Sequence, residues 1–357
     1  MLQRRIRMPK AATGGRFAGL VRIACVAGCI AVLVSCAVFR PPERDRRTLA
    51  GVPGGGEAAA ALPSDRWWEG FGDTDLDGLI ELALTRNTSL GRAEARLRQA
   101  EALAVRAGAA RLPEVSFEAG AGITRRETDV VIPGQDDTEQ SYSLGIAGRY
   151  EIDLWGRVRA SRRTVALERE ATRADLQTAA MSIAAEITRH YLELLSTRQA
   201  IDLIERQLDV NRKRLELIRL RFRRSRATAL DVLQQEELVA QTEALLPLQR
   251  AREATLLHAI AVLAGLPPDH ELGLTSRRLP AVDPLPGDGL PARVLEKRPD
   301  VRAAWLRLLS ADWAVSGARA ARMPAVSIST AARYDSDDMA TLFDNWLLNL
   351  AGNLAQP

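Results

Sequence analysis

Apolar residues recur at helical spacing from Leu76 to about Arg111. Steps of three and four residues place such side chains on one side of an α-helix. Pro113 stops the pattern, because proline has no amide proton to donate and disfavours helix in the residue before it. The segment up to Arg111 is therefore predicted to be helical. Its apolar positions are Leu79, Ile80, Ala83, Leu84, Ala93, Leu97 and Ala100.

Alternation of apolar and polar residues replaces the helical spacing in residues 115–124 and 141–153. Val115 and Phe117, for example, flank Ser116, a pattern that is typical of β-strands. A polar loop containing Pro133-Gly134 separates the two segments, so residues 115–153 are predicted to form a β-hairpin. An isolated hairpin is marginally stable, and strands of about ten alternating residues fit a transmembrane barrel. The hairpin is therefore expected to join a larger sheet.

A heptad pattern begins beyond Gly156, and neither glycine nor proline occurs again before Pro247. Its alternating steps of three and four are typical of the a/d seam of a coiled coil. A second apolar row beside the seam lets the helix pack against two neighbours, as a member of a ring of helices does. The seam comprises Leu176, Ala180, Ile183, Ile187, His190, Leu194, Thr197, Ile201, Ile204, Leu208, Asn211, Leu215, Ile218 and Phe222. The second row comprises Leu203, Val210, Leu217 and Leu220.

The seam breaks after Phe222, and the chain is predicted to reverse direction within residues 224–230. Thr228 is a candidate N-cap residue, and Asp231 three positions later makes a weak form of the capping box. Before this turn, a helix from residue 157 to residue 224 would be about 100 Å long at 1.5 Å per residue. The returning helix is predicted to end near Leu266, so residues 157–265 form a long helical hairpin.

A tandem repeat relates two parts of the chain. Ala107–Ser116 recurs as Ala318–Ser327 with the spacing Ala-x-Ala-Ala-Arg-x-Pro-x-Val-Ser, an offset of 211 positions (318 − 107). Repeats of this length are duplicated structural halves. The first repeat is predicted to span residues 64–278 and the second 292–357, with a Pro- and Gly-rich linker over 279–291. Residues after Asp153 have no counterpart in the second repeat, which is therefore expected to be incomplete.

Residues 1–35 have the layout of a secretory signal peptide. Basic residues precede an apolar run, residues 23–34, that is shorter than the roughly 20 residues of an ordinary membrane-spanning helix. Leu33-Val34-Ser35-Cys36 resembles the bacterial lipobox, so Cys36 is predicted to carry acyl chains such as palmitate. Lipoproteins of this kind with aspartate after the lipidated cysteine tend to stay in the inner membrane. This chain has Ala37 at that position, so the resemblance implies the outer membrane. The alternative is an ordinary signal peptide with a chance cysteine. Residues 36–63 are predicted to be a lipid-anchored linker.

The charge balance argues against nucleic acid as a partner. The net charge is +4 and aromatic residues make up 4% of the chain, whereas a nucleic-acid binder combines a concentrated basic face with stacking aromatics. A local basic cluster exists, and a solvated helix end explains it at least as well as a binding role does. It comprises Arg219, Arg221, Arg223, Arg224 and Arg226. Removal of the signal peptide leaves Cys36 as the single cysteine, so no disulfide framework is expected.

The sequence contains no catalytic constellation. His190, His258 and His270 are scattered, and His190 on the heptad seam is interpreted as a packed core residue. Asp335, Asp337 and Asp338 lack the full spacing of a calcium loop and are interpreted as a solvated loop. Glycine-rich phosphate loops and paired Cys/His metal motifs are absent from the sequence. We therefore predict no enzyme activity, no metal and no cofactor.

An ordered series of motifs resembles the outer-membrane factor family, the TolC-like exit ducts of tripartite drug-efflux pumps, and in particular its lipoprotein branch serving RND-type pumps. The resemblance implies a mainly α fold with a β-hairpin per repeat. Long periplasmic helical hairpins would adjoin strands of a homotrimeric, twelve-stranded β-barrel in the outer membrane, through which drugs or other small molecules leave passively. The motifs are the lipobox, Trp68 with Phe71–Leu76, Asn87–Leu90, Arg111–Pro113, Tyr150–Arg157, Ala229–Gln234, Leu263–Pro267 and Lys297–Val301.

The same resemblance implies that the helical turn meets a periplasmic adaptor (membrane fusion) protein, which links the duct to an inner-membrane RND-type transporter. The turn residues expected to face the adaptor are Arg224, Ser225, Arg226, Ala227, Thr228, Leu230 and Asp231. Family members usually have glycine at the position of Ser225. Serine lacks the freedom of glycine at positive φ, so this position is a departure from the family pattern.

Two alternatives remain open. Because the second helical hairpin, which would carry the family's gate residues, has no counterpart here, one alternative is a truncated, non-conducting remnant. Such a chain is expected to assemble poorly, since its apolar seams would face water. The other alternative is a lipid-anchored, periplasmic coiled-coil structural protein without a pore.

Overall fold

The chain divides into two compact units, and several helices run from one unit into the other. The computed structural model describes residues 39–41, 66–125, 138–281 and 297–356. Cys36, the signal peptide and most of the linker 36–63 lie outside these residues, as does the polar loop of the predicted strand hairpin. One unit includes residues 100–169 and 306–357, and the other includes residues 46–99 and 170–305.

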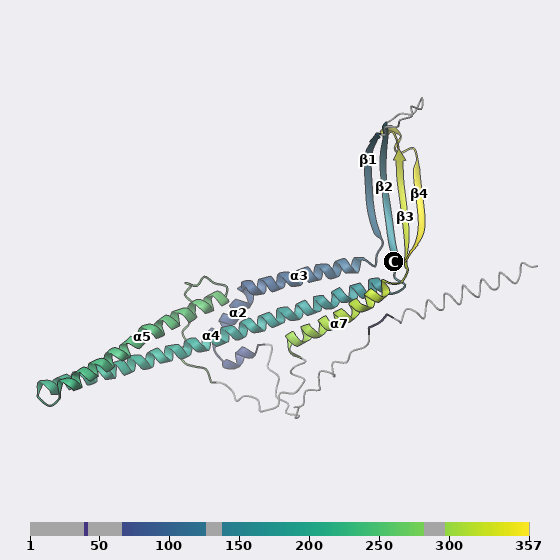
Figure 1. Ribbon diagram of the computed structural model, residues 1–357. Coiled ribbons are helices and arrows are strands. Elements are labelled where there is room, and N and C mark those ends of the chain that lie inside the picture. Colours follow the sequence, from purple (N-terminus) through teal and green to yellow (C-terminus); the bar gives the residue numbers. More distant parts are fainter. Residues whose placement is uncertain (1–38, 42–65, 126–137, 282–296, 357) are drawn as a thin grey trace, which may run out of the picture. The chain divides into compact units, whose positions relative to one another are not determined.

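The first unit contains an antiparallel sheet of four strands in the order β1-β2-β3-β4 (Figure 1). The strands are β1 (Glu114–Arg125), β2 (Thr138–Ile152), β3 (Ala325–Ser336) and β4 (Trp346–Ala355). Each ladder keeps one register along its whole length, from Glu114 opposite Arg149 to Arg125 opposite Thr138 in the first pair, with no bulge. The 3₁₀ turn η3 (Met339–Thr341) lies between β3 and β4.

The predicted strand hairpin is confirmed with small changes at its ends. β1 covers the predicted segment 115–124, and β2 begins at Thr138, three residues earlier than predicted. The predicted second strand included Asp153, but β2 ends at Ile152. The Asp153 carboxylate instead accepts hydrogen bonds from the Val158 and Arg159 amides, so this residue caps a helix rather than pairing in the sheet.

In the same unit, the start of α4 (Arg157–Arg223) packs against the end of α7 (Pro299–Ala320). Ser310 Oγ donates to the Thr164 carbonyl at 3.1 Å. Both helices have small residues where they meet, since Gly317 lies against Ala160. The helix α7 and strand β3 have the lengths of α3 (Thr88–Ala109) and β1, displaced by 211 positions (299 − 88 and 325 − 114).

The second unit buries the main apolar core. The 3₁₀ turn η2 (Trp67–Phe71), α2 (Thr74–Arg86) and the start of α3 provide one part of it, and α4 with α5 (Ala229–Leu263) provides the other. Asn87 separates α2 from α3, and its side-chain oxygen accepts from the Ser89 and Leu90 amides. The predicted helices up to Arg111 are confirmed. The core comprises Trp68, Leu76, Leu79, Ile80, Ala83, Leu90, Ile183, Ala184, Ile187, Tyr191, Leu194, Leu195, Leu256 and Ile260.

The helices α4 and α5 lie side by side as an antiparallel hairpin (Figure 1). Along α4 the predicted seam is buried or half-buried from Leu176 to Ile218, whereas the second row is exposed, with Leu203 at 65%. Two seam positions differ from the prediction. His190 is half-buried and its neighbour Tyr191 is fully buried, because the α2 core presses on this part of α4 as well as α5 does. Phe222 is 46% exposed, in the last turn of α4, where the hairpin ends and fewer neighbours cover the side chain.

Candidate functional site

The sheet has one apolar face. The register aligns Phe117, Ile146, Ala332 and Leu348 in a single row across the four strands. Because alternate residues point to opposite sides, the other rows of this parity share the face. The large apolar side chains on this face are exposed, so no part of the described chain covers it as a core. They are Val115, Phe117, Ile123, Ile146, Tyr150, Ile328, Trp346, Leu348, Leu350 and Leu354.

The opposite face of the sheet is polar and carries small residues. One row consists of Ser116, Ala147, Ala331 and Asn349. A groove of about 560 Å³ lies over this face. Gly145 is needed in it, because a Cβ added there would lie 2.6 Å from the Cβ of Arg333. Arg333 in turn forms an ion pair with Asp335 at 2.6 Å, so this face holds fixed charges.

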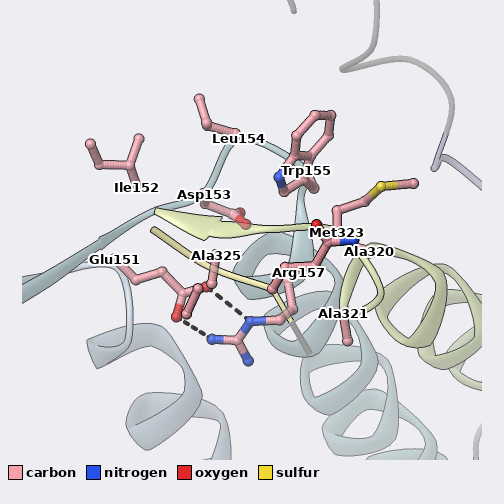
Figure 2. A pocket seen from close by; sticks show the side chains of 12 residues that line it. Glu151, Ile152, Asp153, Leu154, Trp155, Arg157, Ala320, Ala321, Met323 and Ala325 are labelled. Carbon is pink, nitrogen blue, oxygen red and sulfur yellow. Dashed lines mark hydrogen bonds and ion pairs between the residues drawn. The ribbon is translucent and has the colours of Figure 1, made fainter. Parts of the chain in front are cut away.

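The junction between β2 and α4 is a small, well-bonded cluster (Figure 2). The Trp155 indole donates to the Pro324 carbonyl at 2.8 Å, which ties the junction to the residues before β3. Arg157 reaches back to the Glu151 carboxylate, with Nε at 2.9 Å. Gly156 supplies the positive φ of 80° that turns the chain from strand to helix. A cavity of about 380 Å³ lies beside these residues.

A polar layer interrupts the apolar seam of the α4–α5 hairpin. The Asn211 side-chain amide donates to Thr242 Oγ1 at 3.1 Å, and the Gln235 amide donates to the Asn211 carbonyl at 3.2 Å. All three residues are buried. Because a buried polar group without a partner is costly, this layer favours one register of α5 on α4. Ion pairs between α4 and α5 flank the apolar seam along the hairpin. They are Arg198 with Glu253, Arg250 with Glu205, Arg212 with Glu243, and Arg219 with Glu236.

The α4–α5 turn is an ordered structure. Helix α4 ends in a Schellman motif, in which the Arg226 amide donates to the Arg221 carbonyl at 2.8 Å and the Ser225 amide to the Phe222 carbonyl at 2.9 Å. Ser225 takes the left-handed conformation of this motif, with φ of 57°, and it is the only non-glycine residue in the described chain with positive φ. The prediction that the chain reverses between residues 224 and 230 is confirmed.

Helix α5 begins with a complete capping box, where the sequence predicted a weak form of one. Thr228 Oγ1 accepts from the Asp231 amide at 3.2 Å, and the Thr228 amide donates to the Asp231 carboxylate at 2.8 Å. The Thr228 hydroxyl donates to the same carboxylate at 2.7 Å, and the two hydrogen bonds that the carboxylate accepts hold the pKa of Asp231 below its ordinary value. The negative charge of Asp231 is therefore committed to the cap.

At the other end of the hairpin, carboxylates from the start of α2 bind α4 and the segment after α5. The fully buried Tyr191 donates its hydroxyl to Asp73 at 2.8 Å, and burial raises the pKa of Tyr191. Asp75 accepts from the Thr275 and Ser276 amides at 2.9 and 3.0 Å. Burial alone would raise the pKa of Asp75, but these hydrogen bonds outweigh it and the pKa is lowered.

The predicted site residues fall into three groups. The turn residues from Arg224 to Asp231 are brought together as expected, and Cys36 lies outside the described residues. Asp335 is paired with Arg333 and Asp338 caps η3, so the three aspartates near the end of β3 do not converge on one point. Sequence reasoning missed the contacts of Asp73, Asp75 and Tyr191. The N-cap pattern of Asp73 before α2 was the available signal for one of them.

Groups of side chains that could hold a metal ion are absent from the described residues. None of the described helices combines the length and the apolar content that crossing a membrane requires.

Comparison with known proteins identifies relatives over most of the chain. The sequence model of a family described as outer membrane efflux protein matches residues 79–266. The pyoverdine export outer membrane protein OpmQ of Pseudomonas putida is 30% identical over 348 residues, which is 95% of this chain and 73% of that protein. OpmQ of Pseudomonas aeruginosa is 35% identical over 300 residues, 82% of this chain and 63% of that protein. The chain thus spans less than the full length of these relatives.

The fold is shared with a solved channel. The outer-membrane channel OprN superposes with a TM-score of 0.78 at 27% identity, covering 89% of this chain and 73% of that one. The strands and long helical hairpin predicted from the sequence are therefore those of a TolC-like channel. The chain belongs to the outer membrane efflux protein family.

Proposed function

We propose that this protein is the outer-membrane channel component of a tripartite efflux pump, a passive exit duct for drugs or other small molecules that performs no covalent chemistry. The observation that carries the proposal is the two-faced sheet. Its strands of 12, 15, 12 and 10 residues are long enough to cross a bilayer, for which about 9–11 residues suffice. The apolar face suits lipid and the polar face suits a water-filled bore.

The two edge strands of the sheet would need further strands to pair with in a membrane. In the described sheet β1 and β4 each pair on one side only, and unpaired backbone groups are costly in hydrocarbon. We propose that a homotrimer joins these edges into a closed, twelve-stranded barrel. The exposed second row on α4 supports the same assembly, because Leu203, Val210 and Leu217 would each contribute about 1.5–3 kcal/mol if a neighbouring helix buried them.

The turn between α4 and α5 is the proposed contact with a periplasmic adaptor protein, and through the adaptor with an inner-membrane RND-type transporter. Its order supports this role, since a rigid tip loses little conformational entropy on binding. Cys36 is proposed to anchor the mature N-terminus in the outer membrane through acyl chains. The relatives named for pyoverdine export make pyoverdine a second cargo to test beside drugs.

The test places one arginine on either face of β4. Leu350 lies at the middle of the strand on the apolar face, and Asn349 next to it lies on the polar face. In Leu350→Arg the charge meets lipid and costs about 2–4 kcal/mol near the bilayer midplane, so the yield of assembled protein in the outer membrane should fall. Asn349→Arg carries the same side chain one residue away and should assemble normally.

Both variants and the parent chain are expressed in a host that lacks its own efflux channel but has an RND-type transporter and adaptor. Drug resistance and pyoverdine in the medium are measured with the amount of protein in outer-membrane fractions. The proposal expects resistance or export from the parent and Asn349→Arg only. Equal assembly of the two arginine variants, or correctly assembled protein that restores neither readout, would contradict it.

A further inference from the structure

The tip of the α4–α5 hairpin, residues 219–231, is strongly basic. Residues 219–231 contain five arginines, one aspartate and no lysine. Arg219 is paired with Glu236 along the hairpin edge, and the Asp231 carboxylate is bound to Thr228 in the capping box. The four remaining arginines are exposed and form no ion pair with any carboxylate of the described chain. They are Arg221, Arg223, Arg224 and Arg226.

Arginines behave differently along the rest of the hairpin. Arg198, Arg206, Arg212 and Arg250 each form an ion pair with an acidic residue of α4 or α5. The tip differs in that four arginines without an acidic partner in the described chain stand together within six residues, 221–226. Because like charges repel, a cluster of arginines without acidic partners costs stability in the free protein.

The dipole of a helix accounts for part of the cluster but not for all of it. A cation near a helix C-terminus is stabilising, which explains one or two arginines in the last turn of α4. Arg226 lies beyond the helix, and its amide together with that of Ser225 already satisfies two of the last carbonyl groups. The tip thus carries more positive charge than the end of α4 requires.

We propose that the α4–α5 tip is a docking surface for an acidic protein loop, in which the four arginines bind aspartate or glutamate side chains of the partner. The inference rests on the proposed function and deepens it, because it names the chemistry of the adaptor surface that this tip recognises. Guanidinium groups match carboxylates in a planar, two-bond geometry, and arginine is enriched at protein interfaces.

Apolar side chains complete the surface. Phe222 on the last turn of α4 and Leu230 and Leu233 on the first turns of α5 are exposed, Leu230 at 63%. Protein interfaces combine apolar contacts with charged hydrogen bonds in this way. The partner is therefore a loop with acidic residues around an apolar centre.

The placement of the arginines favours a protein over a lipid surface. Residues on a helix advance by about 100° each, so Arg221 and Arg223, about 200° apart, lie on opposite sides of the last turn of α4. Arg224 and Arg226 follow in the turn. A helix that binds a membrane surface gathers its basic residues on one face, above an apolar face. Arginines around the whole tip instead fit a partner that surrounds it.

The experiment uses the purified full chain in detergent and two synthetic helical-hairpin peptides. The peptides are identical except for four loop positions, which are glutamate in one and lysine in the other. We expect the glutamate hairpin to bind saturably, with affinity that falls as salt rises, and the lysine hairpin not to bind. Arg221→Gln with Arg224→Gln should weaken binding of the glutamate hairpin about tenfold, because exposed ion pairs contribute up to about 1 kcal/mol each.

Arg252→Gln is the matched control. Arg252 is an exposed arginine of α5 far along the helix from the turn, and it also lacks an ion pair in the described chain, so its loss should leave the affinity unchanged. Glutamine keeps the length and helix propensity of the side chain, so the variants should fold. Equal binding of the two hairpins, or equal affinity of the tip variant and the parent, overturns the inference.

Vesicles of phosphatidylethanolamine with one quarter phosphatidylglycerol provide the competing outcome. If they bind the tip more tightly than the glutamate hairpin and lose binding in the tip variant, the surface recognises lipid and the inference is wrong. The efflux assay separates the two proposals. Full resistance from the tip variant refutes the acidic partner and leaves the proposed efflux duct intact. Binding of the glutamate hairpin by a parent chain that restores neither resistance nor export refutes the efflux duct and leaves the acidic partner intact.

Discussion

Replacement of Ser225 by glycine should stabilise the α4–α5 turn. Ser225 is held at φ of 57° by the Schellman motif, and no hydrogen bond of its side chain is present to be lost. The left-handed conformation costs an L-residue about 1–2 kcal/mol, which glycine avoids. Glycine also has more conformational freedom in the open state, and the loss of this freedom on closing costs about 0.5–1 kcal/mol. The net gain should be about 0.5–1 kcal/mol.

Hydrogen exchange measures this gain where it arises. Local opening of the turn exposes the Ser225 and Arg226 amides, which donate to Phe222 and Arg221 in the closed turn. A gain of this size should slow exchange of a peptide covering the turn by about two- to fivefold, as followed by mass spectrometry on the full chain. Peptides from the middle of α5 should exchange as in the parent.

Two further substitutions at the same position control for other causes. Ser225→Ala keeps a Cβ atom and therefore the strain, so its exchange should match that of the parent. Ser225→Val adds a β-branched side chain at positive φ and should exchange faster. If Ser225→Gly exchanges at the parent rate or faster, the backbone of Ser225 is not strained and the reasoning from φ fails.

The other predictions concern the end of the hairpin away from the tip, the middle of the hairpin and the N-terminus. Tyr191→Phe should lower stability by about 1.5–3 kcal/mol in thermal unfolding, because the hydroxyl bonded to the Asp73 carboxylate is lost; an unchanged midpoint would contradict this. The pKa of Asp75 is lowered in the folded state, so its contribution is present above about pH 4 and is lost as pH falls through the folded pKa; protease cleavage near its bonded segment should rise in acid, and Asp75→Asn should remove the pH dependence. Asn211→Ala should cost about 1–2 kcal/mol and speed exchange in the middle of the hairpin, and a silent substitution would deny the polar layer a role. Cys36→Ser should abolish acyl labelling; a labelled variant would refute lipidation.

The sequence predicted the elements better than their contacts. The seam, the cap at Thr228 and the strand alternation all depend on neighbours within a few residues, so periodicity and propensity find them. The choice between His190 and Tyr191 depends on α2, which is more than 100 positions away in sequence. A strict heptad also drifts by about 20° per repeat from a straight α-helix, so a seam extended over many turns misplaces its later members. The bonds of Asp75 to residues after α5 are equally long-range and had no local pattern.

The uninterrupted register of the sheet restricts how the lengths of its strands can change during evolution. Deleting or inserting one residue within a strand moves every later side chain to the opposite face, which would expose charges such as Arg333 on the apolar side. A change of two residues keeps the parity, and a change in the turn segment between β3 and β4 leaves both strands as they are. Insertions and deletions among descendants of this sequence should therefore accumulate between the strands, while the strands themselves vary by substitution alone.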